Sequence, residues 1–578
     1  MTTFDPRQPR WRIQSRRAPS ILAALTAMYG LLSLVSALLP SQRDRVHDLL
    51  RFVPIAASAT ATASTAVAGI LLLQLSRGLR RRKRRAWRAA VVIDALLIFL
   101  HVLKGLDVEE AALALVLLAV LVLGRKEFYA RGDPRTRWLA VRAFVGLAVT
   151  GLASGMLLLQ LYDESIVGKP SFGAQLQQVV LGLVGVSGPL HFTRDRPGDV
   201  VTFTLMAFGV LTALVTAFLV LRPFEPRPNL SADDESRLRE LLARHGTRDS
   251  LGYFALRRDK SVVWSPSDKA AVTYRVVTGV ALASGDPLGD PEAWPGAIEA
   301  FLTLTREHAW VPAVMACSEQ GGTAWSRAGL DALELGDEAV VDIADFTLEG
   351  RAMRGVRQAV GRVERAGCTA RVCRQRDLTP TELTELGLAA KAWRGGDSER
   401  GFSMALSRFG DAGDGDCVVV TGHQEGRLVG LLAFVPWGAD GLSLDLMRRD
   451  RAAENGLNEF LICQLLAAAP GLGVRRVSLN FAVFRSSLER GQRLGAGPVT
   501  RLWSRLLIFA SRWFQIESLY RFNVKFRPVW EPRFVCFPAS RDLPRIALAA
   551  LEAEAFVNRP QPFRRLRAIV ESPGSGSV

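Results

Sequence analysis

Long apolar runs occupy the first 222 residues of the chain, whereas beyond Arg222 apolar and charged positions interleave as in a globular core. A membrane-spanning helix needs about 17–25 apolar residues. Six segments are candidates: 21–39, 53–75, 89–103, 111–123, 143–161 and 200–221. The third and fourth are short, so they are either tilted spans or one re-entrant hairpin. Both alternatives leave an even number of crossings and predict that the two ends of this unit lie on one side of the membrane.

Charge indicates which side that is. Residues 1–222 hold 27 Lys and Arg against 13 Asp and Glu, a net +14 out of +17 for the whole chain. The basic residues gather before the first span, at 80–85 and at 125–137, while the alternate loops are mixed or acidic. Basic loops stay on the cytoplasmic side. We therefore predict a multi-pass membrane protein whose N-terminus and second half lie in the cytoplasm, and not a uniformly basic nucleic-acid binder.

Cysteine and histidine give no sign of a metal site. The six cysteines lie in the second half without a Cys-x-x-Cys pair, and the six histidines are scattered. Reduced cytoplasmic thiols are expected, and no metal or other cofactor is predicted. A serine hydrolase is disfavoured because no Gly-x-Ser-x-Gly elbow occurs.

The second half predicts an α/β layered sheet in two lobes, because strand-like and helix-like runs alternate. A proline-rich segment at 223–228 cannot continue a helix and marks the boundary. Strands of the first lobe are expected at 253–256, 261–264, 271–277, 279–283, 311–317 and 339–343, with helices at 291–308 and 321–328. Strands of the second are expected at 369–373, 417–421, 428–435, 442–447 and 474–479, with helices at 380–393 and 457–469.

The similar order of the two lobes suggests a duplicated domain. In the second lobe, a meander followed by strand, loop, helix and strand is the order found in GNAT-type acyltransferases. In those enzymes the loop before the helix is a glycine-rich nest for the coenzyme A pyrophosphate. Residues 448–456 contain one glycine and two acidic residues, so an acyl donor other than coenzyme A is implied.

The predicted fold class is a multi-span α-helical membrane domain followed by a cytosolic α/β domain made of two GNAT-like acyltransferase lobes. The division is 1–222 membrane domain, 223–250 linker and short helix, 251–348 first lobe, 349–367 basic linking helix, 368–545 second and catalytic lobe, and 546–578 C-terminal helix and tail.

Several motifs together resemble one family. They are Gly285-Asp286-Pro287, Glu399-Arg-Gly-Phe402-Ser403, Ser443-Leu-Asp445-Leu-Met447-Arg448, Asn455-Gly456-Leu457, Ser478-Leu-Asn480-Phe481-Ala482, and the stretch from Glu517 to Arg533. The set resembles the aminoacyl-phosphatidylglycerol synthases of the multiple peptide resistance factor type, above all the actinobacterial branch with a fused lysyl-tRNA synthetase. The resemblance covers roughly residues 253–538 and, more loosely, the membrane half. The synthetase domain and the long flippase bundle are expected to be missing here, so lysine as the amino acid rests on the resemblance, and lipid flipping is not expected.

The resemblance implies transfer of an aminoacyl group from a charged tRNA to the glycerol hydroxyl of phosphatidylglycerol. Asp445 stands between Leu444 and Leu446 on an apolar strand, where an unpaired carboxylate is costly, and Arg448 is a candidate partner; a purely structural ion pair is the alternative. By resemblance, Asp445 and Glu399 hold the ammonium groups of the substrate or accept a proton, and Arg448 and Lys525 stabilise the carbonyl oxygen or a phosphate. Further substrate-binding candidates are Ser403, Asn480, Tyr520, Asn523 and Arg527.

Two basic helices are candidate tRNA or phosphate surfaces. The first, at 349–366, carries Arg351, Arg354 and Arg357, and the second, at 499–514, carries Arg501, Arg505 and Arg512 on one face. The arginines of each helix either contact a polyanion or simply face solvent. The second helix could also lie on the bilayer surface.

A lysylated lipid would lower the negative surface charge of a bacterial plasma membrane and give resistance to cationic antimicrobial peptides. Competing hypotheses are a lipid or solute transporter with a cytosolic regulatory domain, and an aminoacyl transferase acting on diacylglycerol or a peptidoglycan precursor. A homo-oligomer is left open.

Overall fold

A computed structural model covers the 578-residue chain. It describes residues 17–38, 55–80, 82–105, 108–130, 135–186, 188–193, 195–221, 226, 228–394, 401–483 and 516–556. These residues form two compact units that divide near residue 224.

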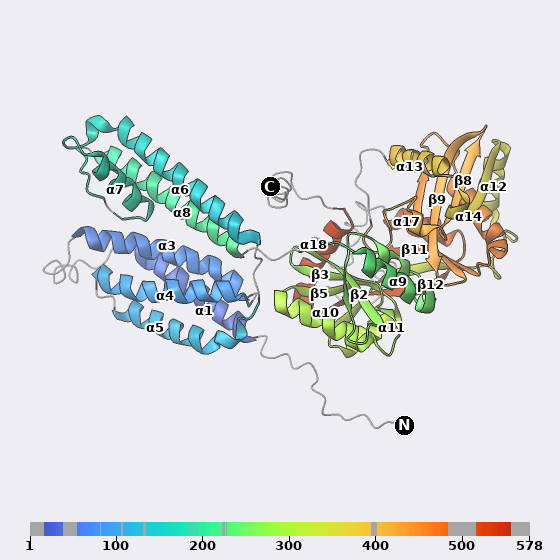
Figure 1. Ribbon diagram of the computed structural model, residues 1–578, viewed down its shortest axis with the longest axis horizontal. Helices are drawn as coiled ribbons and strands as arrows, with labels where there is room; N and C mark the ends of the chain where they lie inside the picture. Colours follow the sequence, from blue (N-terminus) through green and yellow to red (C-terminus); the bar gives the residue numbers. More distant parts are fainter. Residues whose placement is uncertain are drawn as a thin grey trace, which may run out of the picture. The chain divides into compact units, whose positions relative to one another are not determined.

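The first unit is helical (Figure 1), with a helix at each position where a span was predicted. Among the described residues, three helices contain windows long and apolar enough to cross a membrane, at Ala18–Val35, Trp138–Leu161 and Arg196–Ala217. The number of spans stays a prediction, since α5 has only 16 residues. The helices are α1 (Arg17–Leu38), α3 (Ile55–Arg80), α4 (Arg84–Gly105), α5 (Val108–Leu123), α6 (Arg135–Leu161), α7 (Phe172–Leu183) and α8 (Asp195–Leu221).

Two glycines let α1 and α3 approach closely. A Cβ added to Gly30 would lie 2.8 Å from the carbonyl oxygen of Gly69, and one added to Gly69 would lie 2.7 Å from that of Gly30. Small residues at such crossings allow helix backbones to pack against each other within a membrane. This contact belongs to a core shared by α1, α3, α4 and α5.

The second unit contains one mixed sheet of twelve strands within the described residues, in the order β1-β2-β3-β5-β12-β6-β11-β10-β9-β8-β7, with β4 beside β2. The strands are β1 (Ser261–Trp264), β2 (Ala270–Val277), β3 (Val280–Ser284), β4 (Leu288–Gly289), β5 (Val311–Cys317), β6 (Asp331–Asp342), β7 (Cys368–Arg374), β8 (Val418–Gln424), β9 (Arg427–Trp437), β10 (Gly441–Arg449), β11 (Arg476–Val483) and β12 (Val529–Phe537). The helices are α9 (Ala232–His245), α10 (Trp294–His308), α11 (Glu319–Arg327), α12 (Arg354–Arg365), α13 (Pro380–Arg394), α14 (Leu457–Ala468), α17 (Ile516–Val524) and α18 (Leu543–Ala553).

Two parallel β–α–β units repeat within this sheet. Strands β3 and β5 are parallel and joined through α10, and β10 and β11 are parallel and joined through α14. The last strand of the first lobe, β6, pairs with β11 of the second lobe, and the last strand of the second lobe, β12, pairs with β5 of the first. Each β–α–β unit is therefore extended by a strand from the other lobe. The two exchanged strands also pair with each other at the centre of the sheet. The repeat agrees with the duplicated order of the sequence, but the sheet crosses the predicted boundary between the lobes.

Some predicted elements differ from the structure. Residues 253–256, expected as a strand, lie in the 3₁₀ helix η3 (Gly252–Leu256), where Phe254, Ala255 and Leu256 are all buried. A short continuous apolar run fits a buried strand and a buried turn equally well, and here it forms the turn. Strand β6 begins at Asp331 rather than at 339, and α12 begins at Arg354 rather than at 349. The expected helix at 499–514 lies outside the described residues.

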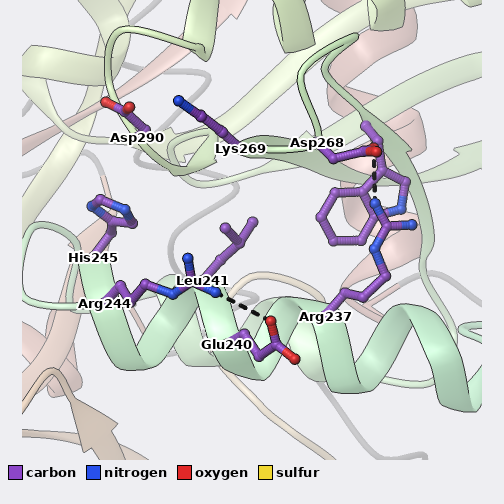
Figure 2. A pocket seen from close by; sticks show the side chains of 9 residues that line it. Arg237, Glu240, Leu241, Arg244, His245, Asp268, Lys269 and Asp290 are labelled. Carbon is purple, nitrogen blue, oxygen red and sulfur yellow. Dashed lines mark hydrogen bonds and ion pairs between the residues drawn. The ribbon is translucent and has the colours of Figure 1, made fainter.

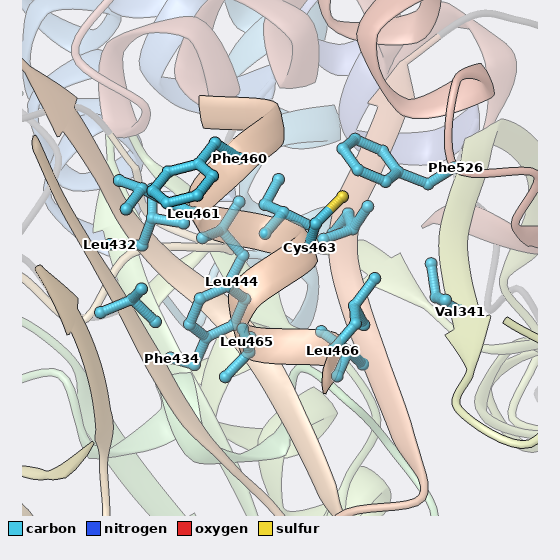
Figure 3. Close-up of a cluster of buried hydrophobic side chains, with 14 of the residues drawn as sticks. Val341, Leu432, Phe434, Leu444, Phe460, Leu461, Cys463, Leu465, Leu466 and Phe526 are labelled. Atoms are coloured by element: carbon cyan, nitrogen blue, oxygen red, sulfur yellow. The ribbon is translucent and has the colours of Figure 1, made fainter. Parts of the chain in front are cut away.

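Helix α14 fixes the position of β10 by packing against the sheet. Figure 3 shows Phe434 and Leu444 from the sheet beside Leu461 and Leu465 from α14. The sheet meets this helix through small residues: a Cβ on Gly430 would lie 2.9 Å from a methyl group of Leu457. Close packing of this kind leaves β10 little freedom to move.

Candidate active site

Strand β10 carries a β-bulge at Asp445. Leu444 pairs with Phe434 and Leu446 pairs with Ala433, so Asp445 is the extra residue of the bulge. On the other side, the pairing of β10 with β11 ends at Ser443. Bulges beside sites often redirect a side chain, and here the bulge stands where the two parallel strands stop pairing.

Asp445 lines a cavity of about 220 Å³. Helix α13, the segment after the undescribed residues 395–400, and β10 form its wall. The lining residues are Gly387, Ala390, Lys391, Arg394, Ala405, Ser407, Arg408, Phe409, Asp445, Leu446 and Arg448. Four cationic side chains therefore surround one carboxylate. Such a site suits a ligand that combines phosphate or carbonyl oxygens with an ammonium or hydroxyl group.

The hydrogen bond of the Asp445 carboxylate comes from the amide of Leu406, at 2.6 Å. Among the described residues this contact, and not the expected pairing with Arg448, holds the carboxylate. Burial raises the pKa of Asp445 to about 6, although the Leu406 amide, Arg257 and Arg408 act in the opposite direction. A carboxyl group with a pKa in this range can accept and return a proton near neutral pH.

Arg408 is fixed by two acidic residues. It donates to Asp414 at 2.7 and 2.8 Å and to Glu235 of α9 at 2.9 Å. Its charge is thus largely balanced within the protein. Lys391 lines the same cavity, and no ion pair joins it to another side chain within the described part of the chain.

Two asparagines brace the strands where they separate. The Asn480 side-chain amide donates to the carbonyl of Leu444 at 2.6 Å, and Asn480 has a left-handed backbone with φ of 68°. The Asn523 amide donates to the carbonyl of Leu479 at 3.3 Å. The side-chain oxygens of both are buried and accept no hydrogen bond from the described residues. Neither asparagine lines the Asp445 cavity, so in this structure both hold the backbone of the strands beside it.

Apart from Asp445 and Arg448, no predicted site residue within the described part of the chain lines this cavity. Lys525 pairs with Glu459 of α14 at 2.7 Å and does not line the cavity. Ser403 is buried and hydrogen-bonded to Glu554 at 2.9 Å. Tyr520 packs against Trp530 with ring centroids 5.5 Å apart, and Arg527 is exposed. Glu399, Arg501, Arg505 and Arg512 lie outside the described residues.

The arginines of the first basic helix are exposed. Arg354 begins α12, and Arg351 lies just before it. Arg357 donates to the carbonyls of Leu348 and Gly350, the latter at 2.8 Å, so it also fixes the chain that leads into the helix.

A second cavity, of about 530 Å³, lies between α9 and the β1–β2 hairpin (Figure 2). Its charges pair among themselves, since Arg237 contacts Asp268 at 2.8 Å and Arg244 contacts Glu240 at 3.2 Å. The Arg237 guanidinium also lies 3.8 Å from the ring centre of Trp264. Three Lys or Arg side chains and three Asp or Glu side chains line this cavity, so their charges balance and it is the less suitable one for an anionic substrate.

Sequence reasoning missed Lys391, Arg394 and Arg408. Gly387, Lys391 and Arg394 share one face of α13 at helical spacing, which is a signal that the sequence does contain. Within the described residues, no group of three His, Cys, Asp or Glu side chains is arranged to hold a metal ion, and the six cysteines are free thiols.

Each of the two units matches a known protein family model. Residues 239–537 match the family model described as phosphatidylglycerol lysyltransferase, C-terminal, and residues 14–222 match the transmembrane region of lysyl-tRNA synthetase. The lysylphosphatidylglycerol biosynthesis bifunctional protein LysX of Rhodococcus opacus is 42% identical over 94% of this chain and 49% of its own length. LysX of Mycobacterium marinum is 41% identical over 97% of this chain and 52% of its own length. The chain thus spans about half the length of these curated relatives.

Among solved structures, L-PGS from Bacillus licheniformis aligns with 58% of this chain and 99% of its own, with a TM-score of 0.50 and 21% identity. This likeness supports the fold of the α/β unit, and the match of residues 14–222 to a transmembrane region supports the helical membrane domain that precedes it in the chain.

Proposed function

The chain belongs to the phosphatidylglycerol lysyltransferase family, and on this premise we propose that it transfers an aminoacyl group, lysine first among the candidates, from a charged tRNA to a glycerol hydroxyl of phosphatidylglycerol. The relatives named for lysylphosphatidylglycerol biosynthesis support the choice of lipid and amino acid. The tRNA donor is what the family resemblance implies, and it suits the reaction because an aminoacyl ester of tRNA is already activated for attack by an alcohol.

The observation that carries the proposal is the Asp445 cavity. In the proposed reaction the lipid hydroxyl oxygen attacks the ester carbonyl, the new carbon–oxygen bond forms, and the bond to the tRNA ribose breaks. One proton leaves the hydroxyl and one joins the ribose oxygen. Asp445, whose pKa burial raises to about 6, can take the first proton and deliver the second.

The cationic side chains complete this chemistry. Lys391, Arg394 and Arg448 line the same cavity as Asp445. There they would bind the phosphate of the lipid or of the tRNA end, and would stabilise the carbonyl oxygen as it gains negative charge. Arg408, already paired with Asp414, holds the wall of the cavity instead.

The exposed arginines of α12, together with Arg351, are the proposed contact for the tRNA backbone. Their function would be electrostatic, so charged-tRNA binding should weaken steeply with salt. The proposed location is a bacterial plasma membrane with the α/β unit in the cytoplasm, where both charged tRNA and lipid are accessible. The product would carry extra positive charge and reduce the attraction of cationic peptides to the membrane.

The test is transfer by the purified full chain in detergent, supplied with radiolabelled lysyl-tRNA and phosphatidylglycerol. A labelled lipid should form with wild type and be strongly reduced with Asp445→Asn. Alanyl-tRNA and diacylglycerol, offered in parallel, separate the amino acid and acceptor choices. No labelled lipid with any charged tRNA and either acceptor would exclude the proposed function.

A further inference from the structure

A short segment of the second lobe forms part of the cavity wall and is held from several directions. We call residues 401–408 the cavity strap. Ala405, Ser407 and Arg408 of the strap line the Asp445 cavity, and the Leu406 amide donates to Asp445 at 2.6 Å. The strap therefore both shapes the cavity and holds its carboxylate.

The strongest attachment of the strap comes from the C-terminal helix. The carboxylate of Glu554, just after α18, accepts hydrogen bonds from the Phe402 amide at 2.7 Å and from the Ser403 amide and hydroxyl at 3.1 and 2.9 Å. Its backbone carbonyl also accepts from the Gly401 amide at 3.4 Å. Phe402 and Ser403 are almost fully buried. A carboxylate that satisfies three donors fixes the local backbone strongly.

The first lobe holds the other side of the strap. Arg257 donates to the carbonyl of Ala405 and to the hydroxyl of Ser407, both at 2.8 Å. The ammonium of Lys260 lies 4.7 Å from the ring centre of Phe402 and is itself held by the carbonyl of Phe254 at 2.9 Å. Glu554 and Arg257 thus anchor the strap on either side of the Leu406 amide.

We propose that Glu554 is a positioning residue for the Asp445 cavity: by holding Phe402 and Ser403, it places the Leu406 amide against the Asp445 carboxylate. This inference rests on the proposed function, because it assigns to Asp445 a part in the transfer. Glu554 lies 109 residues after Asp445 in the chain, and its hydrogen bonds reach the Asp445 cavity through the strap.

A pH profile separates this role from general support of the fold. Burial raises the pKa of Asp445 to about 6, and the hydrogen bond from Leu406 opposes that rise. If the strap loosens, this opposition weakens and the acidic limb of the activity profile should move to higher pH. The charged groups facing Asp445 stay in place in this comparison: Arg257, Asp414, Arg408, Lys391, Arg394 and Arg448. Lys260 also faces the strap: burial lowers its pKa to about 7, and the Glu554 carboxylate opposes that lowering. Loss of the Glu554 charge should therefore move the Lys260 titration to lower pH, the direction opposite to the movement expected for the acidic limb.

The experiment compares Glu554→Gln with wild type in the full chain. Glutamine keeps the shape of the side chain but turns a donor toward the strap amides. We expect kcat to fall about 10- to 100-fold, KM to change about threefold or less, and the acidic limb to rise by about half a pH unit or more. Glu554→Asp should recover part of the loss. Glu552→Gln, which makes the same charge change two residues earlier, is the matched control and should retain wild-type kinetics.

Hydrogen–deuterium exchange provides a measurement that does not depend on activity. In Glu554→Gln, the peptide containing residues 401–408 should lose protection by about tenfold, while peptides from β2 and β3 keep theirs. Ser403→Ala removes only the hydroxyl hydrogen bond to Glu554 and should give a smaller loss of protection. Unchanged exchange in the strap, or a fall in kcat with no movement of the acidic limb, would overturn the inference. A wild-type protein that transfers nothing would instead count against the proposed function, and the exchange result would still decide on the strap.

Discussion

Arg533 of β12 lies at the centre of the sheet, and its replacement tests how much the buried ion pairs between the exchanged strands contribute to stability. Its guanidinium contacts Glu338 of β6, with one hydrogen bond at 2.8 Å, and Asp249 at 2.7 Å. It also donates to the hydroxyl of Ser250 at 2.6 Å. Only 2% of the Arg533 side chain is exposed, and Glu338 is fully buried. One buried cation therefore balances two buried carboxylates.

Arg533→Met keeps most of the side-chain volume and removes the charge. Glu338 and Asp249 are then left without a cation, and breaking a buried pair in this way costs about 3–5 kcal/mol. The unit has roughly 330 residues, and about 2.1 cal/mol/K of unfolding entropy per residue gives roughly 0.7 kcal/mol/K. The expected fall in melting temperature is therefore about 4–7 °C.

The assay is thermal unfolding of the full chain in detergent, followed by tryptophan fluorescence at a fixed scan rate. Arg427→Met is the matched control, because Arg427 pairs with Asp450 at 2.8 Å on the exposed surface, where such a pair contributes about 0–1 kcal/mol. The double variant Arg533→Met with Glu338→Gln should recover part of the loss, since it leaves fewer unpaired carboxylates. If Arg533→Met melts within about 1 °C of the control, the buried network does not stabilise the sheet as argued.

Three further outcomes can be checked. Asp445→Asn should lose transfer by about 10²-fold or more in the lipid assay, yet its melting temperature at pH 7.5 should be higher than that of wild type. The pKa of Asp445 is raised to about 6 in the folded protein, so ionisation of this carboxyl group lowers the stability as the pH rises from about 4 to about 6. Asparagine does not ionise and avoids this loss of stability. Gly30→Leu should destabilise the membrane unit by about 1–3 kcal/mol in detergent melts, because its Cβ would meet Gly69, whereas Gly146→Ala has nothing within 4 Å and should be silent. Replacing Arg354 by Gln should lower the slope of log affinity for charged tRNA against log salt by about 0.7–0.9, and an unchanged slope would remove this arginine from the tRNA surface.

Much of the fold follows from local pattern. Long apolar runs predicted the helices of the first unit, and alternating strands and helices predicted the order of the second, since both signals lie within ten to thirty residues. The strand predicted at 253–256 was wrong because a short apolar run fits a 3₁₀ turn as well as a strand. The pairing of β6 with β11, and of β12 with β5, joins segments far apart in the chain, and no local pattern encodes it.

The candidate site was predictable only in part. The bulged carboxylate Asp445 stood out because it interrupts an apolar strand. Lys391 of α13 lines the same cavity, and Glu554, just after α18, binds the strap. These contacts join segments far apart in the chain, so they depend on the tertiary fold and no local pattern predicts them. Lys525 had the right chemistry, but its salt bridge with Glu459 directs it elsewhere.

The order in which the strands are made has a consequence for biosynthesis. Strand β5 cannot pair with β12 until residue 537 has been synthesised, 195 residues after β6 ends at residue 342. At about 5–20 residues per second, the ribosome needs roughly 10–40 s to cover that distance. During this interval the nascent chain carries an unpaired β5 edge with apolar residues on it, and exposed edges of this kind recruit other chains. Slow translation should therefore favour aggregation of partly made chains, and holdase chaperones should be found on them before β12 emerges.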